Sequence, residues 1–565
     1  MTNVRTETYI DSSRVSRWNA GRDIAAALLL GIALVLPWNL SFGVGVPGSS
    51  TVLFALVVLA TLLAWAALIA GYIGRRGKRS VSPPTASPSR TRFGLALPYL
   101  VVAAGFVAFA FVQAMRFGGT GDVPPGIGPG LLAGLAGALF VAQPPVSGGG
   151  RPGRWFGVAR VIGVAAALLA SVAVLGNLYW RTRYPVQALA EGAYGGQNIA
   201  VIATAVVYGA VAWVAVLVGL RWTFTDRPSS RLATVALGAS TFLGAAVVWM
   251  LGVGRDIDAF HGIAQTTSTA AVGFEGYVAW VAIGAIIAPW ALRAATPSHA
   301  AVGDWREAVR KCLALLAIWC AGSALLRVFD LIVAASLELP YSAYDSIALL
   351  VFDVVAGAAA MWIRFNINGG ALHPVVLSAA AAVLFVLTIC RVVVGVGLAP
   401  RILYSAEPEA LRDAVYGNML EHQITSTFDV VLCWLALAVV ATSVVVFQRG
   451  GLRRKARAMG PAGPAAPTVE AATAAVSAVE PSTQRLAQAD VSAPTAAVPT
   501  AATPTATVPA TAPKIARDSQ DSTEGVGTGT GRKLSASRVL EESTRRFAAG
   551  TTYTGTGPPR QPPES

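Results

Sequence analysis

Four ionisable side chains within apolar stretches near the C-terminal end are the residues best suited to do chemistry. Arg327 and Arg391 each lie late in one apolar stretch, and Asp353 and Asp429 each lie early in the next one. A charge at the centre of a membrane-spanning helix costs about 2.5–3.5 kcal/mol, so such groups are expected to be paired or to line a polar path. We predict the pairs Arg327–Asp353 and Arg391–Asp429, with Asp330, one helical turn after Arg327, competing for the same guanidinium.

These charged residues belong to an internal duplication within residues 309–448. In each copy an arginine comes late in one apolar run, Tyr-Ser-Ala stands at the turn (341–343 and 404–406), and Phe-Asp-Val-Val opens the next run (352–355 and 428–431). Repeats are common in transporter folds, but helical bundles also grow by duplication. The ion pairs are therefore either structural pairs that fix each hairpin or groups along a path for an ion, a proton or an anionic lipid.

A second polar group lies further towards the N-terminus, where Asp256, Asp258 and His261 follow one apolar stretch and Glu275 opens the next. Carboxylates and an imidazole can hold a divalent metal or a sugar diphosphate. Two carboxylates and one histidine on one short segment do not complete such a site. The helical spacing of the apolar residues between them favours a helix that lies on the outer membrane surface. No metal ligand set, cofactor or catalytic residue is predicted.

The elements that position these residues are membrane spans. Of the 565 residues 54% are hydrophobic and only 13% are charged, against about a quarter in soluble domains. Apolar runs of roughly 20 residues return along the first four fifths of the chain, each long enough to cross a hydrocarbon core of about 30 Å. The formal charge of +14 comes largely from loops on one side of these runs, as membrane topology requires, and we predict no nucleic-acid partner.

The sequence predicts an all-α, polytopic membrane protein of about twelve transmembrane helices in antiparallel hairpins. A cytoplasmic segment (1–22) precedes the transmembrane domain (23–448), whose fourth span is placed at 128–142. Lys and Arg fill every second loop, which puts both termini in the cytoplasm. Frequent Ala, Gly, Val and Arg favour a GC-rich bacterium and therefore its plasma membrane, with the lipid bilayer as the first partner.

Beyond Arg449 the composition changes to Ala, Pro, Thr, Ser and Gly, and residues 449–565 are predicted to be a disordered cytoplasmic tail. A similar phrase occurs twice in it, from Ser482 to Ala487 and within the stretch from Ser537 to Ala548. The repetition is either chance in a biased sequence or a linear motif that folds on a cytoplasmic protein partner.

One loop partly resembles a known transporter family. Gly71 to Arg79 is similar to the motif between the second and third helices of major facilitator transporters, with one residue missing and Arg75 in place of an aspartate. A basic loop that stops membrane transfer is the preferred interpretation. Signatures of hydrolases, zinc peptidases and P-loop enzymes are absent from the sequence, so an enzyme is not favoured. The hypotheses are a transporter or a lipid or solute translocator, and alternatively a membrane scaffold for envelope assembly that recruits partners through its tail.

Overall fold

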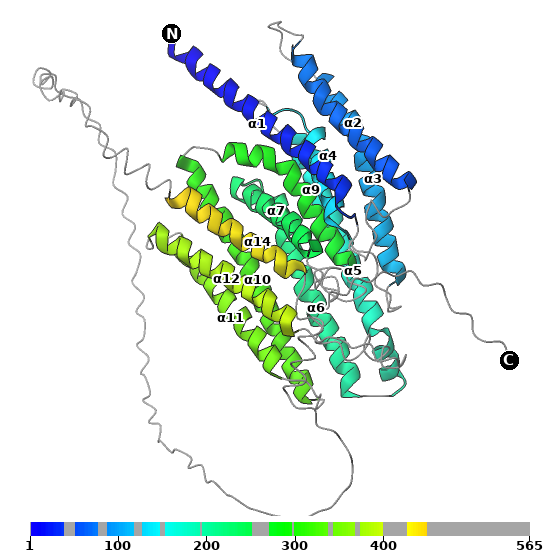
Figure 1. Ribbon diagram of the computed structural model, residues 1–565. Coiled ribbons are helices and arrows are strands. Elements are labelled where there is room, and N and C mark those ends of the chain that lie inside the picture. Colours follow the sequence, from blue (N-terminus) through cyan, green and yellow to red (C-terminus); the bar gives the residue numbers. More distant parts are fainter. Residues whose placement is uncertain are drawn as a thin grey trace, which may run out of the picture. The chain divides into compact units, whose positions relative to one another are not determined.

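The structure is a computed structural model (Figure 1), and it describes eleven ranges of the chain. These ranges are 2–38, 51–76, 87–117, 127–146, 153–192, 195–250, 270–295, 299–336, 343–367, 373–398 and 427–448. Every regular element within them is a helix, and eleven of these helices are long and apolar enough to span a membrane. The chain is therefore a polytopic helical membrane protein, which confirms the predicted fold class.

Besides the short helix α4 (Pro129–Ala142), the described bundle contains eleven long helices. In chain order they are α1 (Thr2–Val35), α2 (Thr51–Arg76), α3 (Ser87–Phe117), α5 (Gly153–Ala190), α6 (Gly196–Arg221), α7 (Pro228–Met250), α9 (Ala270–Ala294), α10 (His299–Ser336), α11 (Ala343–Asn366), α12 (Pro374–Leu398) and α14 (Thr427–Thr442). The 3-10 turn η2 (Trp222–Phe224) extends α6, and the π-helical turn η4 (Ser443–Gln448) follows α14.

The predicted fourth span is a short helix, α4 (Pro129–Ala142), which is the difference between twelve predicted and eleven observed candidate spans. Its 14 residues rise only about 21 Å, less than the hydrocarbon thickness of about 30 Å. Almost all of its residues are buried, because α1, α3 and α9 pack around it. An apolar run of this length is thus a core helix of the bundle.

Glycines let α4 approach its neighbours closely. A Cβ atom at Gly130 would lie 2.3 Å from the carbonyl oxygen of Leu36, and one at Gly134 would lie 1.9 Å from the hydroxyl of Tyr99 on α3. These two residues, with Gly137, form a small-residue face of α4.

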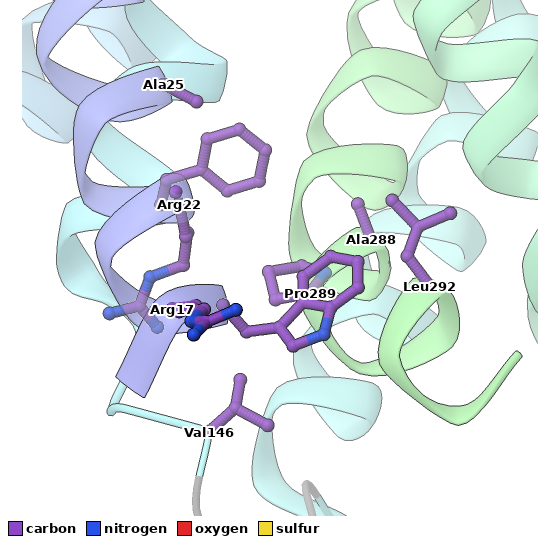
Figure 2. A pocket seen from close by; sticks show the side chains of 10 residues that line it. Arg17, Arg22, Ala25, Val146, Ala288, Pro289 and Leu292 are labelled. Carbon is purple, nitrogen blue, oxygen red and sulfur yellow. The ribbon is translucent and has the colours of Figure 1, made fainter. Parts of the chain in front are cut away.

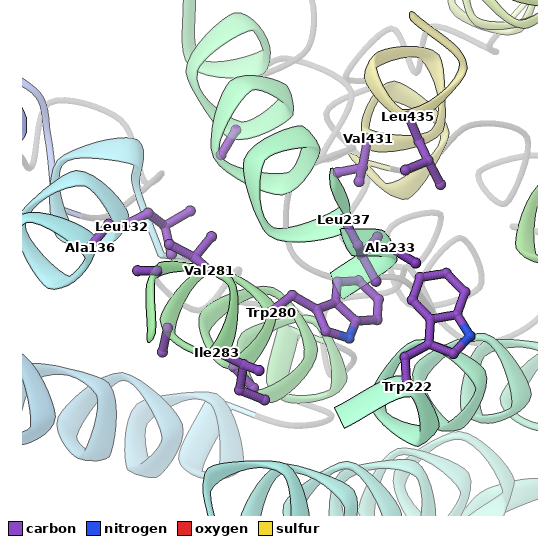
Figure 3. Close-up of a cluster of buried hydrophobic side chains, with 14 of the residues drawn as sticks. Leu132, Ala136, Trp222, Ala233, Leu237, Trp280, Val281, Ile283, Val431 and Leu435 are labelled. Carbon is purple, nitrogen blue, oxygen red and sulfur yellow. The ribbon is translucent and has the colours of Figure 1, made fainter. Parts of the chain in front are cut away.

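The apolar core is continuous from α4 to α14 (Figure 3). Leu132 of α4, Trp280 and Ile283 of α9, Leu237 of α7 and Val431 of α14 are all buried. The helix α9 packs against α4, α5 and α7, and α7 packs in turn against α10 and α14. This core connects the N-terminal helices with the C-terminal group that holds the charged residues.

The C-terminal helices pack in chain order, α10 on α11, α11 on α12 and α12 on α14, and α10 also contacts α14. At the other end of the chain, α1 runs without a break through the predicted domain boundary at residue 22. Contacts divide the chain into the units Met1–Ala466 and Pro467–Ser565. The second unit, with both tail phrases, lies outside the described residues.

Candidate functional site

Four neighbouring helices position the charged residues in one half of the bundle. At a rise of 1.5 Å per residue, Arg327 lies about 14 Å from the end of α10, and Asp353 lies about 15 Å from the start of α11. Arg391 lies about 10 Å from the end of α12, and Asp429 lies in the first turn of α14. The ends of α10 and α12 and the starts of α11 and α14 lie on one side of the bundle, because successive helices are antiparallel. The residues therefore extend from that membrane surface towards the middle of the bundle.

Arg391 is shared by two aspartates from different helices. Its Nε donates a hydrogen bond to Oδ1 of Asp353 on α11, and its Nη1 donates one to Oδ1 of Asp429 on α14. All three residues are buried, with 6%, 1% and 3% of their surface exposed in the order Arg391, Asp353, Asp429. A single guanidinium thus connects α11, α12 and α14 in the interior.

Asp429 has a further donor on α10. The indole Nε1 of Trp319 donates a hydrogen bond to Oδ1 of Asp429 at 2.5 Å. The ring of Trp319 lies edge-on to Phe428, with centroids 4.8 Å apart, and Trp280 of α9 packs on the same phenyl ring at 5.6 Å. Aromatic packing therefore holds the start of α14 and orients its carboxylate.

Arg327 and Asp330 complete the buried set. They form an ion pair at 4.0 Å within α10, and both side chains are at most 10% exposed. The charge of Arg327 also interacts with that of Asp353. The structure thus brings Arg391 to Asp429, the partner that the hairpin pattern predicted, and Asp353 is hydrogen-bonded to Arg391 while it interacts with Arg327 electrostatically.

We call these five residues the charged centre: Arg327, Asp330, Asp353, Arg391 and Asp429. It contains two guanidinium groups and three carboxylates, so it carries one excess negative charge when all five are ionised. The second oxygen of Asp353, Oδ2, is buried and has no hydrogen-bond partner among the described residues. The centre can therefore neutralise itself by taking up one proton or one monovalent cation.

A second buried ion cluster, which the sequence analysis missed, connects α1 with α3. Asp23 accepts a hydrogen bond from Arg22 at 2.9 Å and another from Arg92 at 2.6 Å, and all three side chains are at most 4% exposed. We call Arg22, Asp23 and Arg92 the N-terminal ion cluster. Asn19, one turn before Asp23 on α1, forms hydrogen bonds with the backbone N–H and carbonyl of Val146. The signal in the sequence was the single acidic residue, Asp23, at the start of the first apolar run.

The predicted outer polar group is not described as a site. Asp256, Asp258 and His261 lie outside the described residues. Glu275 lies in the first turns of α9, in a part of that helix whose side chains are also outside the description. The proposed metal or sugar-diphosphate alternative for these four residues stays a prediction.

The fold and the charged centre define the class: an integral membrane protein whose apolar helices enclose a buried network of arginines and aspartates. The chain belongs to the family of the domain of unknown function DUF7937, whose profile matches residues 19–446. That range contains both ion clusters. No curated protein and no solved structure matches the chain.

Proposed function

We propose that this protein is a transporter, which moves an ion, a small solute or a lipid across the membrane and uses the charged centre as its polar path. The observation that carries the proposal is the second carboxylate oxygen of Asp353, which is buried in the charged centre without a hydrogen-bond partner among the described residues. Within this centre three aspartates also lie near only two arginines. Charged groups are expensive inside a membrane and mark ion paths and proton relays in many transporters. A site that only fixed helices could use equal numbers of both charges.

Asp353 is the group that this proposal assigns to ion exchange. Arg391 binds one of its oxygens, and the other oxygen is buried without a hydrogen-bond partner among the described residues. A proton or a monovalent cation on this oxygen would neutralise the centre, and its release would restore the excess charge. Alternation between these two states is what coupling to an ion gradient requires.

The orientation and the membrane are parts of the same proposal. Lys and Arg concentrate in alternate loops, which supports cytoplasmic N- and C-termini under the positive-inside rule. These termini require an even number of passes, and the segment of α4 supplies the twelfth, because it runs back along α1 from Trp38 to Asn19. The charged centre then lies in the outer half of the bundle. Composition supports the plasma membrane of a bacterium.

The test is ion flux in proteoliposomes. Purified protein would be reconstituted with a pH-sensitive dye inside, and a membrane potential would be imposed with potassium and valinomycin. We expect proton entry above that of empty vesicles, lost in Asp353→Asn and retained in the matched control Asp226→Asn, which changes an exposed aspartate between α6 and α7. A second run with a sodium-sensitive dye distinguishes the two cations. Absence of flux for both ions, or equal flux in Asp353→Asn, would contradict the role of Asp353 in ion exchange.

One observation favours the scaffold alternative: Arg391 binds aspartates on both neighbouring helices, as a structural crosslink would. Buried ion pairs can be purely structural. Cys433, one turn after Asp429 and only 7% exposed, distinguishes the two cases when Cys312, Cys320 and Cys390 are replaced. Labelling of Cys433 by an impermeant maleimide added outside intact cells would show that water reaches the centre. Protection, together with a phenotype lost on deletion of residues 467–565, would support the scaffold.

A further inference from the structure

A pocket of about 440 Å³ lies between α1, α4 and α9, away from the charged centre (Figure 2). Arg17 and Arg22 line its α1 side, and Pro289 and Leu292 line its α9 side. Its volume is within the usual range of small-molecule sites, about 300–1,000 Å³. Its lining includes two arginines and no acidic residue.

Among the side chains that the structure describes, arginines outnumber carboxylates around this pocket. Arg22 is held in place by the carbonyl oxygen of Pro144 at 2.7 Å and by Asp23. Asp23 is shared with Arg92, so the N-terminal ion cluster has one carboxylate for two guanidinium groups. Arg17 adds an exposed guanidinium, which has no ion pair with any residue whose side chain the structure describes. The pocket therefore attracts an anion.

The rest of the pocket is apolar. Trp18 of α1, Phe140 of α4 and Pro289 and Leu292 of α9 supply most of the lining. A free inorganic anion would leave these side chains in contact with water, whereas a ligand with an acyl chain would cover them. The ligand chemistry that fits both parts is a phosphate joined to a hydrocarbon chain.

The position along the helices points to the same ligand. The candidate span of α1 begins at Ser16, and that of α9 ends at Ala294, so the pocket lies at the level of the lipid headgroups. Tryptophan and arginine are favoured at this depth, where an indole spans the interface and a guanidinium reaches phosphate.

We propose that this pocket binds one anionic phospholipid, with the phosphate between Arg17 and Arg22 and an acyl chain along Phe140 and Leu292. This inference is independent of the transport proposal, because none of these residues belongs to the charged centre. It assigns the N-terminal ion cluster a role in ligand binding as well as in packing.

Native mass spectrometry of the full chain in detergent tests the proposal. The probes are phosphatidylglycerol and phosphatidylcholine at equal concentration. We expect more phosphatidylglycerol than phosphatidylcholine to stay bound. Arg17→Gln should weaken the binding of phosphatidylglycerol about fivefold, which is the effect of one basic residue at the interface. The matched control is Arg90→Gln, which removes an exposed arginine near the start of α3, outside the pocket lining.

A second variant fills the pocket without changing charge. A Cβ atom at Gly21, which lines the pocket, would meet no atom within 4 Å, so Gly21→Leu can fold and occupy the space of the ligand. Gly94→Leu is its control, because Gly94 is equally open but lies on α3. We expect Gly21→Leu to abolish the preference for phosphatidylglycerol and Gly94→Leu to preserve it.

Three results would overturn the inference. The unaltered chain could bind both lipids equally, Gly21→Leu could retain the preference, or Arg17→Gln and Arg90→Gln could weaken binding to the same extent, which would indicate general surface charge. Inorganic phosphate at millimolar concentration should leave the lipid bound. Displacement by phosphate would identify the free anion as the ligand.

Discussion

Trp319 and Asp429 are hydrogen-bonded across α10 and α14, with 2.5 Å between the indole Nε1 and the carboxylate Oδ1 that Arg391 also binds. One oxygen atom therefore receives a neutral donor and a charged donor from two different helices. A carboxylate oxygen can accept two hydrogen bonds, and Phe428 holds one of these donors in place by packing against the indole of Trp319.

Replacing Trp319 with phenylalanine should destabilise the bundle by about 1.5–3 kcal/mol, because a hydrogen bond to a charged group is lost. Trp280→Phe is the control. Trp280 packs on the same phenyl ring and is fully buried, but its Nε1 has no hydrogen-bond partner among the described residues. Chemical unfolding in detergent measures both. Equal losses would mean that the hydrogen bond contributes nothing beyond ring packing.

The three residues joined at Arg391 should differ in their effects on stability. Arg391→Gln leaves two buried carboxylates without their cation and should cost about 3–5 kcal/mol. Asp353→Asn removes the excess charge and leaves Arg391 paired with Asp429, so it should cost least or stabilise. Asp429→Asn should fall between them. The ranking comes from unfolding midpoints in detergent, and an Asp353→Asn protein as unstable as Arg391→Gln would contradict the charge count.

Gly134→Ala should destabilise by about 1–3 kcal/mol through overpacking. Its Cβ would lie 1.9 Å from the hydroxyl of Tyr99, whose ring is fully buried and cannot turn away. Tyr99→Phe in the same chain should recover part of the loss, since that hydroxyl has no hydrogen-bond partner among the described residues. Gly105→Ala, at an open position on α3, is the control. Equal unfolding midpoints for Gly134→Ala and Gly105→Ala would argue against the close contact.

Asp226, in the loop between α6 and α7, should make the stability of the fold depend on pH. Asp226 accepts hydrogen bonds from Arg160 at 2.6 Å and Arg231 at 3.2 Å, and these bonds, that of Arg160 foremost, hold the pKa of its carboxyl below its usual value of 3.8. A depressed pKa stabilises the folded state above pH 4, and this contribution disappears as the pH falls through the folded value. The effect is small because Asp226 is exposed.

Thermal unfolding at pH 6 and pH 3 of the unaltered chain and of Asp226→Asn checks this sign. At pH 6 the unaltered chain should unfold at a higher temperature than Asp226→Asn. This difference between the two proteins should shrink at pH 3. A difference that grew on acidification would mean that the arginines do not stabilise the ionised carboxylate.

The membrane class could be predicted from the sequence because it depends on composition and run length, which are local. The Arg391–Asp429 pair could be predicted for a related reason: neighbouring helices in a hairpin place an arginine near one end beside an aspartate near the start of the next. The hydrogen-bond partner of Asp353 was harder to predict from the sequence, because it depends on how α11 and α12 pack. The internal repeat itself stays a prediction, since both Tyr-Ser-Ala turns extend outside the described residues.

Two features required the three-dimensional structure. A run from Gly128 to Ala142 reads as a span by hydropathy, and only its burial by three helices shows that it is a short core helix. The bond between Asp23 and Arg92 joins residues 69 positions apart. Nothing local in either segment specifies the other.

The place of Arg391 in the chain has a consequence for how the protein is made. It follows Asp353 by 38 residues and precedes Asp429 by 38 residues. During synthesis α12 therefore enters the membrane beside a carboxylate that is already there, which offsets the cost of inserting a guanidinium. We expect a chain that stops at Leu398 to insert α12, and Asp353→Ala to lower the inserted fraction in a translocon assay. The charges of the centre balance once Arg391 is in place, and Asp429, which arrives last, restores the excess negative charge.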